Sequence, residues 1–203
     1  MFVAQSYPTE PSKDLPTESN LGNQGRRATG RNVSVYRPCK IVTSDGECLG
    51  LIRNFSEGGV QIETRSAIRP GEHILYCDAK SEPIPGTVVW AQGTRIGVKN
   101  DAEATFTPIR QHPRAVRVGC AIPCEIWIGG ERVECVASNI SQTGIFVSGV
   151  PSASLGSAAT VTLAGRTIYN SHIRWKHGDG AGIKFPEAVA MQTVIDILER
   201  AQQ

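Results

Sequence analysis

The stretch Asn54-Phe-Ser-Glu-Gly-Gly59 recurs as Asn139-Ile-Ser-Gln-Thr-Gly144, an offset of 85 residues, and alternating apolar residues follow both copies. Both stretches fit the pattern Asn-x-Ser-x-x-Gly. The same offset pairs further identical residues without a gap: Pro38 with Pro123, Cys39 with Cys124, Ile41 with Ile126, Gly71 with Gly156, Trp90 with Trp175, Gly97 with Gly182, and Lys99 with Lys184. The chain therefore contains the same domain twice. An internal repeat of this kind has to be recognised before a fold class is assigned, because the fold is then that of one repeat.

Each copy consists of short alternating apolar runs separated by turn residues, a pattern typical of β-strands joined by hairpins. The turn signals are Asp45-Gly46, Pro70-Gly71 and Gln92-Gly93 in the first copy, and Gly129-Gly130 and Gly178-Asp179-Gly180 in the second. We count about six such runs in each copy, with no helical pattern between them. The sequence predicts an all-β fold of two tandem, small, six-stranded antiparallel barrels.

Only the end of the chain changes its periodicity. Apolar residues there recur at helical spacing, at Val189, Val194, Ile195, Ile197 and Leu198. This spacing predicts one C-terminal amphipathic α-helix that continues to Gln203.

Composition along the chain predicts the domain boundaries. Residues 1–25 are rich in Pro, Thr, Ser, Glu and Asn, and we expect a disordered N-terminal tail because such a segment buries too little apolar surface to fold. The first domain then covers 26–102, a polar linker 103–109, and the second domain with its helix 110–203. A polar linker with few contacts leaves relative domain motion as the default expectation.

Overall composition excludes several classes of protein. The 203 residues include 21 Lys and Arg against 19 Asp and Glu. With charges so nearly balanced, we expect no strong electrostatic attraction to nucleic acid or to membranes. We see neither a secretory signal nor an apolar run long enough to span a membrane, and expect a soluble, cytoplasmic protein. The six cysteines lack a metal-binding spacing and are predicted to be plain buried thiols, so we expect no metal and no cofactor.

A second motif precedes the first strand of each copy. Arg27 and Arg31 form Arg-x-x-x-Arg, with Arg26 beside them, and Arg110 and Arg114 form the same pattern in the second copy. Either motif has a simple structural explanation: solvated charge for the arginines, and for Asn-x-Ser-x-x-Gly a local turn in which glycine supplies a positive φ. Together, in the order arginine pair, strand, turn, strand, Asn-x-Ser-x-x-Gly, they resemble the PilZ domain, the bacterial receptor module for cyclic di-GMP.

The resemblance covers residues 26–203 and implies PilZ-like barrels with a cyclic di-GMP site on each copy. Arginine can fork onto phosphate, pair with the guanine edge or stack on the base, and Asn and Ser can hydrogen-bond guanine. Glycine would let the backbone approach the ligand closely. The implied ligand-binding residues are Arg26, Arg27, Arg31, Asn54, Ser56 and Gly59 in the first domain, and Arg110, Arg114, Arg117, Asn139, Ser141 and Gly144 in the second.

The second copy departs from the pattern in its arginine spacing. Arg31 lies seven residues before Pro38, whereas Arg114 lies nine residues before Pro123. Arg117 lies six residues before that proline, but the pair then becomes Arg-x-x-Arg. Either the arm contains an insertion or the pair is degenerate. We therefore expect the second copy to bind more weakly than the first.

The resemblance implies a cyclic di-GMP effector that couples the level of this second messenger to motility, biofilm or exopolysaccharide output. Its partner would be a flagellar, polysaccharide-synthase or regulatory protein. The alternative is a PilZ-like adaptor that no longer binds nucleotide and acts only through protein contacts. Binding of single-stranded nucleic acid ranks last, because aromatics make up only 6% of the residues. We find no nucleophile elbow, phosphate loop or two-histidine metal spacing, so no enzyme is predicted.

Overall fold

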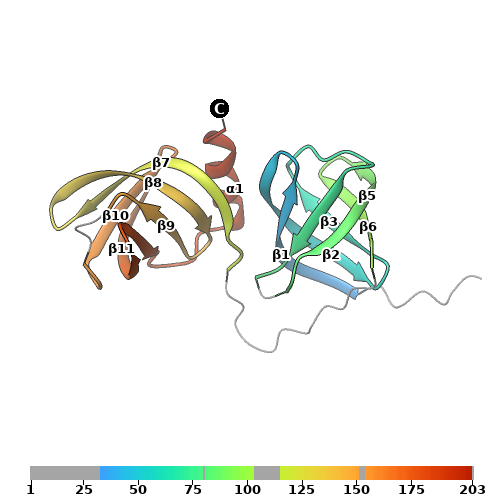
Figure 1. The fold of residues 1–203 in the computed structure, drawn as a ribbon, viewed down its shortest axis with the longest axis horizontal. Coiled ribbons are helices and arrows are strands. Elements are labelled where there is room, and N and C mark those ends of the chain that lie inside the picture. Colours follow the sequence, from blue (N-terminus) through green and yellow to red (C-terminus); the bar gives the residue numbers. More distant parts are fainter. Residues whose placement is uncertain (1–32, 80, 103–114, 151–153, 203) are drawn as a thin grey trace, which may run out of the picture.

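The computed structural model describes residues 33–79, 81–102, 115–150 and 154–202, which form two barrels and one helix (Figure 1). The first barrel contains β1 (Val33–Thr43), β2 (Gly46–Ser56), β3 (Gly59–Thr64), β4 (His73–Cys77), β5 (Ile84–Gln92) and β6 (Arg95–Asn100). The second contains β7 (Val118–Ile128), β8 (Glu131–Ser141), β9 (Gly144–Ser148), β10 (Ala158–Leu163), β11 (Arg166–His177) and β12 (Gly180–Lys184), and α1 (Met191–Arg200) follows.

Both sheets close into barrels with the same strand order. The first runs β1-β2-β3-β6-β5-β4, and the second, taken from β7, runs β7-β8-β9-β12-β11-β10. All neighbouring strands in these barrels pair antiparallel, for example β1 with β2 and β7 with β8. This confirms the predicted fold class of two tandem six-stranded barrels with a C-terminal helix.

Each barrel has its own core, made from alternate residues that point inward. Cys39 and Ile41 are fully buried on β1, and Cys124 and Ile126 take the matching places on β7. The six cysteines are all free thiols, as predicted. Their predicted burial is correct only in part, because Cys39, Cys124 and Cys135 are buried whereas Cys48, Cys77 and Cys120 are half-buried.

The C-terminal helix is shorter than predicted at both ends. It starts at Met191, two residues after Val189, and ends at Arg200. Val189 lies outside the helix because both of its backbone groups bind Gln142: its N–H donates to the Gln142 carbonyl at 2.8 Å, and its carbonyl accepts from Gln142 Nε2 at 3.1 Å. Val194 and Ile197 form the buried face that the periodicity predicted.

Several predictions fall outside the described residues. These are the disordered tail 1–25, the linker 103–109, and the arginines Arg26, Arg27, Arg31, Arg110 and Arg114. The domain boundaries that depend on them stay predictions.

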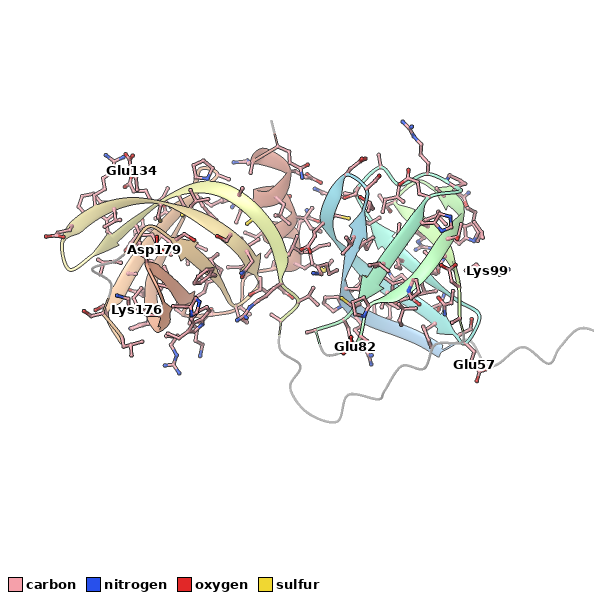
Figure 2. All side chains as sticks on the ribbon, viewed as in Figure 1. Glu57, Glu82, Lys99, Glu134, Lys176 and Asp179 are labelled. Carbon is pink, nitrogen blue, oxygen red and sulfur yellow. The ribbon has the colours of Figure 1, made fainter. Side chains whose placement is uncertain are left out.

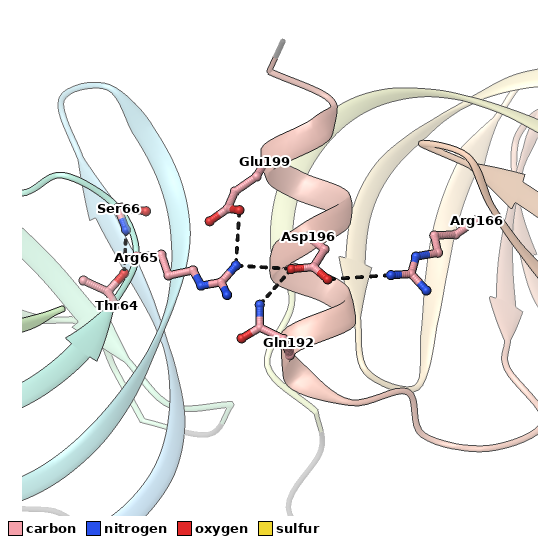
Figure 3. A network of polar contacts seen from close by, with 7 residues as sticks. All are labelled: Thr64, Arg65, Ser66, Arg166, Gln192, Asp196 and Glu199. Atoms are coloured by element: carbon pink, nitrogen blue, oxygen red, sulfur yellow. Dashed lines mark hydrogen bonds and ion pairs between the residues drawn. The ribbon is translucent and has the colours of Figure 1, made fainter.

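Helix α1 lies between the two barrels and carries ion pairs to both of them (Figures 1 and 3). The Arg65 guanidinium of the first barrel lies 3.2 Å from Asp196 and 3.4 Å from Glu199 on α1. The other carboxylate oxygen of Asp196 lies 3.7 Å from Arg166 at the start of β11. These pairs are partly or largely exposed to solvent, so each contributes about 1 kcal/mol or less to stability, and only those of Arg65 join the two barrels.

A more buried contact between the barrels involves the start of β2. The Glu47 carboxylate accepts hydrogen bonds from Lys40 Nζ at 2.8 Å and from the backbone N–H of Gly119 on β7. Partial burial acts to raise the pKa of Glu47, but these two donors outweigh it and hold the pKa below its usual value. Leu49, two residues further on, is 5% exposed and packs into the core of the second barrel. The barrels therefore touch, and the linker is not their only connection.

We predict that Leu49→Ser loosens the contact between the barrels. Burial of a leucine side chain is worth roughly 1.5–3 kcal/mol, more than the exposed ion pairs beside it can supply. The radius of gyration measured by small-angle X-ray scattering should rise. Leu75→Ser is the matched control, because Leu75 on β4 is 41% exposed and should leave the radius unchanged. Equal radii for both variants would show that Leu49 does not hold the barrels together.

Candidate functional site

Each Asn-x-Ser-x-x-Gly stretch forms a hairpin with a two-residue turn, between β2 and β3 in the first barrel and between β8 and β9 in the second. The serine hydroxyl closes the turn by donating to the carbonyl of the glycine three residues later. Ser56 Oγ lies 3.1 Å from the Gly59 oxygen, and Ser141 Oγ lies 3.0 Å from the Gly144 oxygen. The serine proton is therefore engaged within the motif, and the oxygen can still accept a hydrogen bond. In the second copy Ser141 is buried, and its oxygen already accepts from the Thr143 N–H at 3.3 Å.

The glycine of the motif is required by strand packing. A Cβ on Gly59 would lie 2.5 Å from the Val98 carbonyl oxygen on β6, and a Cβ on Gly144 would lie even closer to the Ile183 oxygen on β12. Neither glycine has a positive φ. The turn explanation based on positive φ is thus wrong, because close approach of two strands demands glycine here. Contact between these glycines and a ligand stays a prediction.

A β-bulge precedes the asparagine of the first motif. The β2–β3 register shifts between Ile52 and Asn54, which leaves Arg53 as the extra residue. Arg53 forms a 2.7 Å ion pair with Glu63, and its guanidinium lies 4.8 Å from the centre of the Tyr36 ring. Asn54 Nδ2 donates to Gln61 Oε1 at 2.7 Å. The first motif thus lies in a surface of mutually paired polar side chains.

The second motif has the same backbone but a different surface. Asn139 is paired across the strands with Phe146, where the first copy has Gln61 opposite Asn54. Phe146 stacks on Trp175 with ring centres 4.9 Å apart and planes 4° from parallel. The second motif therefore borders an aromatic surface.

Repeat-equivalent tryptophans cover a glycine in each barrel. A Cβ on Gly182 would overlap the Trp175 indole, and a Cβ on Gly97 would overlap the Trp90 indole. Both tryptophans are nevertheless exposed on their outer side. A flat ring held over a strand in this way can stack with another aromatic group, including a nucleobase.

A pocket of about 220 Å³ adjoins the second motif and is lined by Arg117, Thr143, Gly144, Ile145, Arg174, Trp175, Gly182, Ile183 and Lys184. Three of these residues are cationic and none is acidic, so the pocket favours an anion. Arg174 is the extra residue of a bulge, because the β11–β12 register shifts between Ile173 and Trp175. The pocket thus combines positive charge with a planar ring.

The first barrel carries less positive charge at the equivalent positions. Val89 stands where the second copy has Arg174, and Glu57 stands where it has Gln142, while Lys99 matches Lys184. Glu57 and Lys99 lie on the side of the first barrel that faces away from the second (Figure 2). The two candidate sites therefore differ in charge even though their hairpins match.

The structure brings together some of the predicted residues and adds others. Asn54, Ser56 and Gly59 share the first hairpin, Asn139 and Ser141 share the second, and Arg117 and Gly144 meet in the pocket. Sequence reasoning missed Arg174, Trp175 and Lys184 as site residues. Two of them were noted only as members of the repeat, and comparison of Arg174 with Val89 at the 85-residue offset could have identified the third.

Two negative findings apply to the described part of the chain. Its His, Cys, Asp and Glu residues form no group of three or more that could hold a metal ion. Its single helix, α1, is too short to cross a membrane.

We predict that Gly182→Ala displaces Trp175, because the new methyl group would occupy the position of the indole. Overpacking of this kind typically costs about 1–3 kcal/mol of unfolding free energy. Denaturant unfolding should show that loss, and tryptophan fluorescence should shift in the folded protein. Gly58→Ala is the control, because nothing lies within 4 Å of a Cβ at that position. A Gly182→Ala variant with unchanged fluorescence would contradict this packing.

Solved structures with similar folds come from several bacteria. The Bacillus subtilis inhibitor of motility, MotI/DgrA, shares 13% identity with a TM-score of 0.36 over 84% of this chain and 96% of its own. Borreliella burgdorferi PlzA in complex with c-di-GMP shares 11% identity with a TM-score of 0.34 over 85% and 94%. Escherichia coli YcgR in complex with c-di-GMP shares 10% identity with a TM-score of 0.29 over 80% of each chain. These identities and TM-scores assign no site residue of this chain.

A search of curated proteins finds no match. Comparison with family models gives a direct result: the model of the PilZ domain matches residues 25–105 and again residues 108–200. The two matches correspond to the two barrels and span most of the sequence. The chain therefore belongs to the PilZ domain family, as a protein with two such domains in tandem.

Proposed function

We propose that this protein is a cyclic di-GMP-binding effector that transmits the level of this second messenger through protein contacts. The observation that carries the proposal is the cationic pocket beside Trp175, which adjoins the Asn-x-Ser-x-x-Gly hairpin of a PilZ domain. Two of the similar solved structures, PlzA and YcgR, are complexes with c-di-GMP. Such a ligand presents anionic phosphates and planar guanines, the two features that this pocket suits.

In the second barrel, the pocket would hold a phosphate and the ring a base. Arg117, Arg174 and Lys184 would bind the phosphate oxygens with charge-assisted hydrogen bonds. A guanine could stack on the exposed indole of Trp175, and Asn139 could hydrogen-bond its edge. At about 220 Å³ the pocket suits one part of the ligand, so the remainder would lie over the hairpin. Arg110 and Arg114 stay proposed ligand contacts.

In the first barrel, the proposed ligand contacts are Arg26, Arg27 and Arg31 from the arm, and Asn54, Ser56 and Gly59 from the hairpin. Asn54 Nδ2 already donates to Gln61. The amide carries two N–H donors, so a ligand would use the second or displace Gln61. We propose that the charged arginine arm supplies most of the affinity here, because charge-assisted contacts are the stronger ones.

Two arguments about which copy binds cyclic di-GMP more tightly give opposite answers. The arginine spacing predicts tighter binding by the first copy. The described side chains support the reverse order, because the second copy has Arg174 in place of Val89 and Gln142 in place of Glu57. Added cations and a removed acid strengthen phosphate binding. We propose on this basis that the second barrel is the stronger site.

The cellular process that the effector controls is proposed only as a broad class. MotI is described as an inhibitor of motility. Motility, biofilm or exopolysaccharide control through a protein partner is our proposal for this chain. The rival is an adaptor without nucleotide binding. Calorimetry separates the two: heat of binding from cyclic di-GMP at micromolar concentration supports the receptor, and its absence at high micromolar ligand supports the adaptor.

We predict that Arg174→Val weakens cyclic di-GMP binding at the second barrel by about ten- to a hundred-fold. The variant removes a charge-assisted contact worth roughly 1.5–3 kcal/mol and installs the residue found in the first copy. The measurement is titration calorimetry on the full chain. Arg69→Val is the matched control, because Arg69 is an exposed arginine of the first barrel outside both hairpins. Equal losses in both variants would indicate a nonspecific effect of charge.

For the first barrel, Arg31→Ala should weaken binding more than Asn54→Ala. The arginine contact is charge-assisted, worth about 1.5–3 kcal/mol, whereas a neutral hydrogen bond contributes about 0.5–1.5 kcal/mol. Both variants are best titrated in the Arg174→Val background, which weakens the second site. A larger loss from Asn54→Ala would mean that the hairpin, and not the arm, dominates binding to the first barrel.

A further inference from the structure

Two thiols face each other across neighbouring strands of the second barrel. Cys124 on β7 and Cys135 on β8 are direct register partners, and their Sγ atoms lie 3.2 Å apart. Both belong to the barrel core, but they remain 7% and 8% exposed. At this separation, small rotations of the two side chains could bring the sulfurs to bonding distance.

A groove of about 520 Å³ reaches the pair from solvent. Both cysteines line it, together with charged residues of β7 and β8 such as Glu125, Arg132 and Glu134. Glu134 lies on the end of the second barrel that faces away from the first (Figure 2). A small solute can therefore approach the sulfurs without separation of the barrels.

The hydrogen bond between the thiols gives them different acidities. Donation from Cys124 stabilises the thiolate of Cys135 and lowers the pKa of Cys135. The same bond, together with burial, raises the pKa of Cys124. Cys135 thus loses its proton first, and a thiolate is the reactive form of cysteine.

The first barrel lacks this pair. Its equivalent of Cys124 is Cys39, but the position opposite Cys39 is Gly50. Cys39 is fully buried, and burial raises its pKa. The arrangement thus distinguishes one copy of the repeat from the other.

We propose that Cys124 and Cys135 form a redox-responsive site that a hydroperoxide converts to a reversible cross-strand disulfide. The Cys135 thiolate attacks one peroxide oxygen, the O–O bond breaks, and the departing hydroxide takes up a proton to leave as water. Cys135 is then a sulfenic acid. Cys124 attacks its sulfur, the S–O bond breaks, and the second water leaves with the Cys124 proton. Two thiols lose two electrons and two protons, and one hydrogen peroxide is reduced to two waters.

The test is to treat the folded full chain with hydrogen peroxide, alkylate the remaining thiols, digest with trypsin and analyse the peptides by mass spectrometry. Cys124 lies in the peptide 118–132 and Cys135 in 133–166, so the disulfide should join these two peptides. The joined species should weigh about 2 Da less than the sum of its parts, and dithiothreitol should separate it.

Two variants identify the partner of Cys135, because Cys120 lies in the same tryptic peptide as Cys124. Cys124→Ser should abolish the joined species, whereas Cys120→Ser should keep it. Phenylarsine oxide offers a probe without mutation, because trivalent arsenic binds paired thiols and should protect these two from alkylation. Full alkylation of both cysteines after peroxide, no protection by the arsenical, or a joined species that survives Cys124→Ser would overturn the proposal.

Discussion

The close approach of two strands at one glycine is the constraint on which each barrel depends. Gly59 lies against β6 and Gly144 against β12, and any side chain there would push the neighbouring backbone away. These contacts join the first half of each sheet to its second half, and the sheet closes through them. The serine of the same motif fixes the turn that delivers the glycine. The serine and the glycine of the motif thus have structural roles. The asparagine side chain neither closes the turn nor allows the two strands to come close.

The fold could be predicted because its causes are local. Alternating residues, turn residues and a gap-free repeat specify short antiparallel strands, and two copies of one pattern reinforce each other. The start of the helix was predicted too early because Val189 has a competing partner, Gln142, far away in the sequence. The site was predicted only in part for a similar reason. Arg174 reaches the pocket from a bulge, and a bulge is a property of strand pairing that no single strand reveals.

The two barrels of the repeat share one architecture but differ in the side chains of their candidate sites and cores. Strand order, hairpins and the tryptophan over glycine are shared, because each of them is needed to close and cover the sheet. The copies differ at Val89 against Arg174 and at Gln61 against Phe146. They also differ in the core, where Gly50, packed closely against Ile62, stands in place of Cys135. The second barrel carries the cationic pocket, the stacked rings and the thiol pair. The first carries the paired polar surface around Asn54.

Closure of the sheets also restricts how this protein can meet a partner. Each strand of the two described sheets pairs with a neighbour on both sides, and unpaired backbone is confined to the ends of the long strands: β1, for example, pairs with β4 only over Lys40–Val42. Closure thus leaves little edge that a target could extend by adding a strand, the route that many peptide-recognition domains use. Recognition then falls mainly to side chains on the curved outer walls, where point substitutions can change specificity without disturbing the framework. The same closure limits the edge on which neighbouring molecules could polymerise, a safeguard for a chain whose described residues lie mostly in strands.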